Sequence, residues 1–288
     1  MAQEKWLVNP GQAKTIDIAR VRKMKVGMIG GQIDIIGHDE PGARVEVHSV
    51  SGKELKISID GDTLEIDHPQ LRWDNFLDVF RAWSDKARAD VSVLVPRDVA
   101  LKLGVVSADA LISGLTTDAK LSTVSGEITV DGITGDIDLN AVGGELSVND
   151  HVGAISVHTV SGDITATGAL RTFSADSVSA NIFLDLTGIP DRITANSVSG
   201  DVTIRLDDGV GARYRVNSVT GRLRVDDTVV RRAGDKSFTL QDGSLDGHWV
   251  DVSVNSVSGD VSVVRRPSAS SAADANTGTG SSDEKASA

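Results

Sequence analysis

Short runs of alternating apolar and polar residues follow one another along most of the chain. Ile128-Thr129-Val130 and Val202-Thr203-Ile204 are two of them, and each would place its apolar side chains on one face of an extended strand. Gly, Asp and Ser separate the runs, as is typical of tight turns. The pattern therefore predicts an all-β protein made of many short strands, each with one buried face.

The turns carry a repeated motif, (Ser/Thr)-Val-Ser-Gly-(Asp/Glu), whose valine recurs at a nearly fixed interval. An 18-residue step separates Val106, Val124, Val142, Val160 and Val178, and steps of 20 and 21 residues lead to Val198 and Val219. The last step, 38 residues to Val257, is interpreted as two coils, with Phe238 inside a degenerate one. Hairpins in a sandwich could use similar strands, but they do not require equal spacing. The period favours a β-helix-like solenoid with about 18–21 residues per coil.

Each residue of the motif has an expected structural role. The valine is expected to pack in the core, and the acidic residue to accept hydrogen bonds from nearby backbone N–H groups. Glycine would supply a positive φ at the corner without steric cost. The predicted structural corners are Gly126, Gly135, Gly162, Gly200, Gly221 and Gly259.

The periodicity divides the chain into four parts. Residues 105–266 are predicted to form the regular coils, and residues 14–104 are predicted to form irregular first coils and an end cap, because an open solenoid end would invite aggregation. Residues 1–13 are an N-terminal extension. Residues 267–288 consist of small and polar residues without a hydrophobic pattern, which predicts a disordered tail.

One segment, near residues 69–89, interrupts the strand pattern. Its apolar residues recur at the spacing of one helical face, which predicts a short helical insertion. They are Trp73, Phe76, Leu77, Phe80 and Trp83. An exposed patch of this kind would mark a partner-binding surface, whereas a helix lying on the solenoid would act as a cap. Both alternatives stay open, and the flanking Lys and Arg residues would suit contact with anionic lipid.

Composition narrows the classes of function. Aromatic residues are only 3% of the chain, so Val, Ile, Leu and Ala must fill the core. The net charge of −12 argues against nucleic acid as a partner, and the absence of cysteine excludes disulfides and thiolate metal sites. The first residues lack the apolar stretch of a signal peptide, and no run is long enough for a membrane helix. We therefore expect a cytoplasmic protein, with peripheral membrane association still open.

Two rows of polar residues recur with the coils. One row is acidic and could bind Ca²⁺ if stacked, but turn chemistry and solubility explain it more simply: Glu127, Asp136, Glu145, Asp163, Asp201 and Asp260. The other row precedes the motif and contains Asn196, Asn217 and Asn255. We expect these amides to form a ladder, inward or corner-facing and hydrogen-bonded from coil to coil, rather than to bind a ligand.

No residue pattern predicts catalysis. The histidines do not have the spacing of metal ligands and are expected mostly at the surface or at strand edges: His38, His48, His68, His151, His158 and His248. Neither a nucleophile elbow nor a phosphate-binding loop is present. The pair Asp207-Asp208 lies in a predicted turn. Catalytic, cofactor-binding and metal-binding residues are therefore all predicted to be absent, and no cofactor is expected.

The repeated Ser-Val-Ser-Gly-Asp units, the β-rich leading segment and the step Val93-Leu94-Val95-Pro96 together resemble the bacterial DUF4097 family, also called a "putative adhesin" or toastrack family. The resemblance covers roughly residues 14–266. It implies a single-stranded, right-handed β-helix-like solenoid and a link to cell-envelope stress or surface systems. Catalytic residues are not established for that family, so the resemblance transfers none to this chain.

These observations favour a non-enzymatic β-solenoid scaffold that binds a protein partner, such as a membrane or envelope-stress component. The first alternative is a protein that self-associates end to end into filaments. The second alternative is a carbohydrate-active β-helix enzyme, which would need acids, a base and sugar-stacking aromatic residues in one groove.

Overall fold

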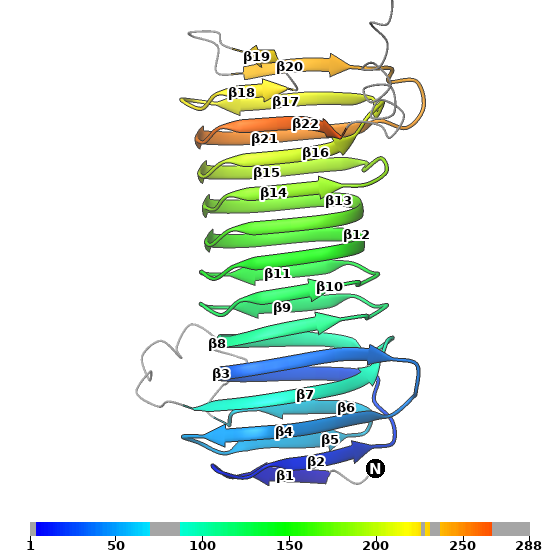
Figure 1. The fold of residues 1–288 in the computed structure, drawn as a ribbon, viewed down its shortest axis with the longest axis vertical. Helices are drawn as coiled ribbons and strands as arrows, with labels where there is room; N and C mark the ends of the chain where they lie inside the picture. The colour runs from blue at the N-terminus through cyan, green and yellow to red at the C-terminus, as the bar shows by residue number, and fades with distance from the viewer. Residues whose placement is uncertain (1–3, 70–86, 226–227, 231–236, 267–288) are drawn as a thin grey trace, which may run out of the picture.

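The computed structural model describes residues 4–69, 87–225, 228–230 and 237–266. These residues form strands and turns without helices (Figure 1). The strands are β1 (Glu4–Val8), β2 (Lys14–Ile18), β3 (Lys23–His38), β4 (Ala43–Ser51), β5 (Leu55–Asp60), β6 (Thr63–Asp67), β7 (Arg88–Pro96), β8 (Ala100–Ser113), β9 (Ala119–Thr123), β10 (Ile128–Asp131), β11 (Ile137–Ala141), β12 (Leu146–Ser161), β13 (Ile164–Ser179), β14 (Ile182–Leu186), β15 (Arg192–Ser199), β16 (Val202–Asp207), β17 (Ala212–Ser218), β18 (Leu223–Val225), β19 (Thr228–Val230), β20 (Ser237–Asp242), β21 (Val250–Ser258) and β22 (Val261–Arg266).

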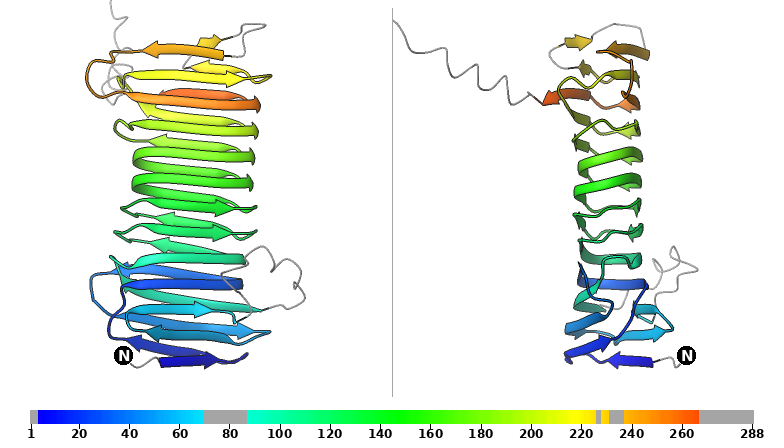
Figure 2. Two further views of the ribbon diagram at one scale, coloured as in Figure 1. Left: turned by 180° about the vertical axis from the view of Figure 1, so that it is seen from behind. Right: turned by 90° about the vertical axis from the view of Figure 1, so that its right-hand side faces the viewer.

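The strands wind into a flattened solenoid with two facing layers (Figures 1 and 2). Each regular coil supplies one strand segment to each layer. Equivalent residues of successive coils pair in parallel: Ile128 faces Leu146 in one layer, and Ile137 faces Ile155 in the other. Both pairs are 18 residues apart, so the predicted period is the coil itself. Alternate side chains point inward and form one continuous core of Val, Ile, Leu and Ala. The all-β solenoid predicted from the sequence is confirmed.

The motif valine does not pack in the core of most coils, and that prediction was wrong. Val106 and Val124 are buried, but the valines of the later coils are about half exposed: Val142, Val160, Val178, Val198, Val219 and Val257. The inward position belongs to the residue before the valine, such as Thr123 or Ser197. The Thr123 hydroxyl donates to the Gly126 carbonyl and accepts from the Gly126 N–H, so it satisfies the backbone of the corner. Because side chains alternate along a strand, the valine must then face outward.

Close stacking is the physical reason for the corner glycines. Gly135, Gly162 and Gly200 have positive φ, as expected, whereas Gly126, Gly221 and Gly259 do not. At every corner, however, a methyl group would overlap the backbone of the neighbouring coil. On Gly162, for example, it would collide with the Gly144 carbonyl. The glycines therefore let successive coils approach to strand spacing at the corner.

The coils do not stack in chain order at the C-terminal end. Strands β21 and β22 pair in parallel with β15 and β16 on one side and with β17 and β18 on the other. Figure 1 shows this orange coil between two yellow ones. The predicted degenerate coil around Phe238 does not exist, because Phe238 lies on β20, which pairs antiparallel with β17 and covers the end of that sheet. Along the chain, the cap strand β20 therefore comes before the last coil, β21 and β22, which lies between two earlier coils.

The N-terminal end has the same kind of insertion. Strand β3 lies between the coil made by β6 and β7 and the coil made by β8, and pairs in parallel with all three (Figure 1). Beyond it, β1 pairs antiparallel with β5, and β2 with β4. Antiparallel strand pairs therefore form both ends of the described stack, in place of the parallel pairing of the coils between them.

Two predicted features are not seen in the described residues. The helical insertion near 69–89 is not confirmed: Arg88 and Ala89 already belong to β7, and residues 70–86 lie outside the described residues. The predicted C-terminal tail, residues 267–288, also lies outside them.

Corner packing can be tested with two glycines that both have positive φ. Gly162→Ala places a methyl group against the Gly144 carbonyl, whereas a methyl group on Gly188 meets nothing within 4 Å. We expect a loss of about 3 kcal/mol for Gly162→Ala, from backbone strain plus overpacking, and about 1 kcal/mol for Gly188→Ala, from strain alone. Urea unfolding measures both. Equal losses would contradict the stacking explanation.

Candidate functional site

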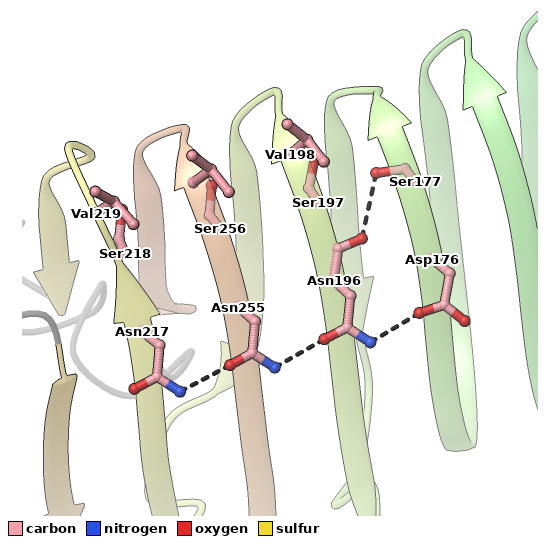
Figure 3. Close-up of a pocket in the computed structure, with 11 residues that line it drawn as sticks. Asp176, Ser177, Asn196, Ser197, Val198, Asn217, Ser218, Val219, Asn255 and Ser256 are labelled. Carbon is pink, nitrogen blue, oxygen red and sulfur yellow. Dashed lines mark hydrogen bonds between the residues drawn. The ribbon is translucent and has the colours of Figure 1, made fainter.

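A shallow groove of about 410 Å³ crosses four neighbouring coils on the outer surface of the sheet that contains β13, β15, β21 and β17 (Figure 3). One edge is a row of polar side chains, and the other is a row of valines at the corner. Inward-directed serines lie between the two rows. The lining residues are Asp176, Ser177, Asn196, Ser197, Val198, Asn217, Ser218, Val219, Asn255, Ser256 and Val257.

The polar edge is a one-directional chain of side-chain hydrogen bonds. Asn217 Nδ2 donates to Asn255 Oδ1 at 2.7 Å, and Asn255 Nδ2 donates to Asn196 Oδ1 at 2.7 Å. Asn196 Nδ2 ends the chain on Asp176 Oδ1 at 2.8 Å. The predicted amide ladder is confirmed, but it faces outward, and its spatial order is 217–255–196 because of the inserted coil. The bonds hold each amide in one orientation.

The apolar edge is formed by the same valines that the sequence analysis assigned to the core. Val198, Val257 and Val219 are 49%, 48% and 54% exposed. Each lies two residues after a ladder asparagine, so both point outward from the same strand. The groove escaped sequence reasoning for this reason. Alternation along the preceding strand was the available signal, because Ala195 and Ser197 are buried and Val198 continues their alternation outward. The inserted coil then brings Asn255 between two residues far from it in the chain.

Charged side chains fasten the inserted coil to its neighbours. Asp251, only 5% exposed, accepts hydrogen bonds from Arg213 Nη2 at 3.2 Å and from Arg215 Nη2 at 2.7 Å. On the other layer, Arg266 Nη1 donates to Asp207 at 2.7 Å, and Arg266 Nη2 donates to Asp185. These pairs connect β21 and β22 to coils on both sides, and the groove depends on the position of that coil.

The corner acids act as acceptors for the next coil. Asp163 accepts from the Asn181 N–H, Asn181 Oδ1 from the Asp201 N–H, and Asp201 from the Asp260 N–H. Asp260 accepts in turn from the Arg222 N–H at 2.7 Å. The predicted turn chemistry is confirmed. Within the described ranges, no three His or acidic side chains converge in a geometry that could hold a metal ion.

Two of the six histidines contradict the surface prediction. His68 and His151 are fully buried, and Ile133 and Leu115 fill the places equivalent to that of His151 in the two preceding coils. His68 Nδ1 accepts from the Ile29 N–H at 3.2 Å, and burial lowers the pKa of His68 to about 4. Burial also lowers the pKa of His151, neither of whose ring nitrogens has a hydrogen-bond partner among the described residues. Both rings are therefore neutral core components near pH 7.

The remaining predicted site residues are distributed as follows. Trp73, Phe76, Leu77, Phe80 and Trp83 lie outside the described residues. The six structural corner glycines lie in the turns, and none of them lines the groove. Residues 106–226 contain three aromatic residues, and two of them, Phe173 and Tyr214, are buried in the core. The third, Phe183, is partly exposed and lies 5.8 Å from the Arg205 guanidinium, outside the groove. Asp207, of the predicted Asp-Asp-Gly turn, bonds Arg266 and the Gly188 N–H.

A family model described as "Toastrack DUF4097" matches residues 21–264. No curated protein matches the chain significantly. Similar solved structures include a "putative adhesin" from Bacteroides fragilis, 13% identical, with 88% of this chain and 98% of that chain covered and a TM-score of 0.45. A "putative cell adhesion protein" from Clostridium sporogenes is 14% identical, with 92% and 99% covered and a TM-score of 0.27. A "putative lipid binding protein" from Parabacteroides distasonis is 11% identical, with 89% and 98% covered and a TM-score of 0.40.

The part of the chain that the structure describes contains no helix long and apolar enough to cross a membrane.

The contribution of the inserted coil's ion pairs to stability can be tested at Asp251. Asp251→Ala removes the shared acceptor of two guanidinium groups, and we expect the free energy of unfolding to fall by about 2 kcal/mol. The control Asp17→Ala breaks the exposed pair with Arg44 and should cost less than about 0.5 kcal/mol. Chemical denaturation measures both, and similar losses would show that Asp251 contributes no more than a surface pair.

The buried histidines predict an acid-sensitive fold. The unfolded chain binds a proton at each histidine near pH 6.5, but folded His68 does not until the pH reaches its lowered pKa of about 4. The free energy of unfolding therefore keeps the full contribution of these histidines above about pH 6.5. It falls as the pH drops toward 4, by about 3 kcal/mol for His68.

His151→Leu removes part of this dependence and restores the aliphatic stack of Leu115 and Ile133. We expect it to stabilise the protein by about 1 kcal/mol at pH 7, because an unpaired buried polar group is removed. The gain should widen between pH 6.5 and pH 5. The same change at exposed His48 serves as the control. Thermal unfolding at several pH values measures both, and a constant His151→Leu gain would contradict the prediction.

Proposed function

Since the chain belongs to the Toastrack DUF4097 family, we propose that it is a non-enzymatic interaction module that displays the groove of Figure 3 to an extended partner. The observation that carries the proposal is the groove itself, in which a fixed amide row and an exposed valine row run side by side over four coils. Regular outward rows on a rigid solenoid are typical of binding surfaces.

The chemistry of the polar residues supports an interaction role. The four aspartates of the corner row accept hydrogen bonds from backbone N–H groups of the next coil, and the groove contains a single ionisable side chain, Asp176. Acid–base catalysis needs a converging set of titratable groups with shifted pKa values. The two described histidines with lowered pKa values, His68 and His151, lie in the core and away from the groove.

The partner and its setting form the finer part of the proposal. As the family resemblance implies, the partner would belong to a cell-envelope stress or surface system. Self-association end to end is not favoured, because antiparallel strands cover both ends of the stack.

Site-specific photo-cross-linking tests this function. A photoreactive amino acid replaces Val257 in the groove, with a matched probe at Thr165 on the opposite sheet. After incubation of the full chain with envelope fractions of its source organism, we expect adducts from position 257 that excess unlabelled chain suppresses, and none from position 165. Equal labelling at both positions, or turnover of the captured material, would overturn the proposal.

A further inference from the structure

The ladder leaves hydrogen-bonding capacity at regular steps. A carboxamide has two N–H donors and two oxygen lone pairs, and the ladder uses one of each on Asn255 and on Asn196. One donor and one acceptor per residue remain for a ligand. Because neighbouring strands are about 4.8 Å apart, the row offers a donor–acceptor pair at that interval. The fixed amides would lose little conformational freedom on binding.

The valine edge supplies apolar contact but too little for a large interface. Six valines along the corner, from Val142 to Val219, are about half exposed. Together they expose roughly 400 Å² of apolar surface, about half of what each partner buries in a stable protein–protein complex. A second copy docked along this row alone would therefore bind poorly. A narrow chain that covers both rows suits the groove better.

The charge of the groove selects an uncharged ligand. Ten of its eleven lining residues are neutral, and the exception, Asp176, is an acid at one end of the ladder. The whole chain carries a net charge of −12, which repels anionic polymers. A cationic ligand would find only one carboxylate, which already accepts a hydrogen bond from Asn196.

The spacing of the ladder distinguishes between two uncharged extended polymers that could lie in the groove, a peptide and a glycan. An extended peptide presents equivalent backbone groups to one side only every second residue, about 6.6 Å apart, and so runs out of step with the amides. An extended β-1,4-linked glycan advances by about one strand spacing per sugar. Successive sugars face opposite ways, but both long edges of each ring carry hydroxyl groups, so each amide still meets one. The C–H faces of the rings can lie against the valines.

We propose that the groove binds an uncharged β-linked glycan that runs along the solenoid axis. Asn196, Asn255 and Asn217 bond hydroxyl groups of successive sugars, and the three valines that line the groove, Val198, Val257 and Val219, contact the sugar rings. This inference rests on the proposed function and specifies the ligand of the same groove. Because the groove contains no aromatic ring, the affinity per site is weak, with a Kd of roughly 1 mM.

NMR titration of the full chain, observed at valine methyl and asparagine side-chain signals, tests the proposal. The probes are cellohexaose and chitohexaose, with α-linked maltohexaose and anionic hexagalacturonate as controls. We expect saturable shifts at Val198 and Val257 with at least one β-linked probe and none with the controls. Asn255→Ala and Val257→Ser should each weaken binding about tenfold.

Matched variants lie in the same rows outside the groove. Asn140→Ala and Val142→Ser change the same residue types two coils or more below it and should leave the affinity unchanged. Absence of saturable shifts with both β-linked probes, or equal effects of groove and control variants, would overturn the proposal. Selective labelling from position 257 without glycan binding would reject the glycan alone, and a captured protein would then be the ligand. Failure of both experiments would reject the interaction role as well.

Discussion

Everything in this protein depends on the parallel register between coils. Equivalent residues lie above one another at strand spacing, and the corners reach that spacing only where the inward-facing side chain shrinks to glycine or alanine. A methyl group on Gly162, Gly200 or Gly259 would strike the carbonyl of the coil beside it. The same register stacks the polar residues of the motif on one another, which joins Asp and Asn residues of successive coils into hydrogen-bonded rows.

The coil formed by β21 and β22, which is out of chain order, keeps this register and so continues the outward rows that line the groove. Strand β21 carries the same motif as β15 and β17, so it fits between them without breaking either row. Pairing alone does not distinguish this order from chain order, because each coil would match each neighbour. The inserted position is marked by a buried carboxylate, Asp251, that accepts hydrogen bonds from both Arg213 and Arg215 of the neighbouring coil. The groove exists where that insertion completes the amide ladder.

Much of the fold was predictable because one repeat of the sequence corresponds to one coil of the solenoid. The alternation in Ile128-Thr129-Val130, the 18-residue period and the amide ladder all follow from local pattern and stacking. The outward position of the valines was missed although it follows from the same alternation: Ala195 and Ser197 face inward on β15, so Val198 faces outward. The inward place next to the corner goes to a hydroxyl such as that of Thr123, which a search for apolar residues overlooks. The burial of His151 was not predictable, because a histidine in an aliphatic stack has no sequence signature of its own.

The sequence by itself determined the solenoid, its period and its composition of core and corners, because these depend on contacts between residues one coil apart. Only the tertiary structure decided the order of the coils at both ends, the antiparallel caps and the groove. Those features depend on pairings between segments as distant as Asn196 and Asn255, and equal motifs cannot specify which of their copies become neighbours. The physical reason is that register is local to each pair of strands, whereas stacking order is chosen by the few side chains in which otherwise similar coils differ.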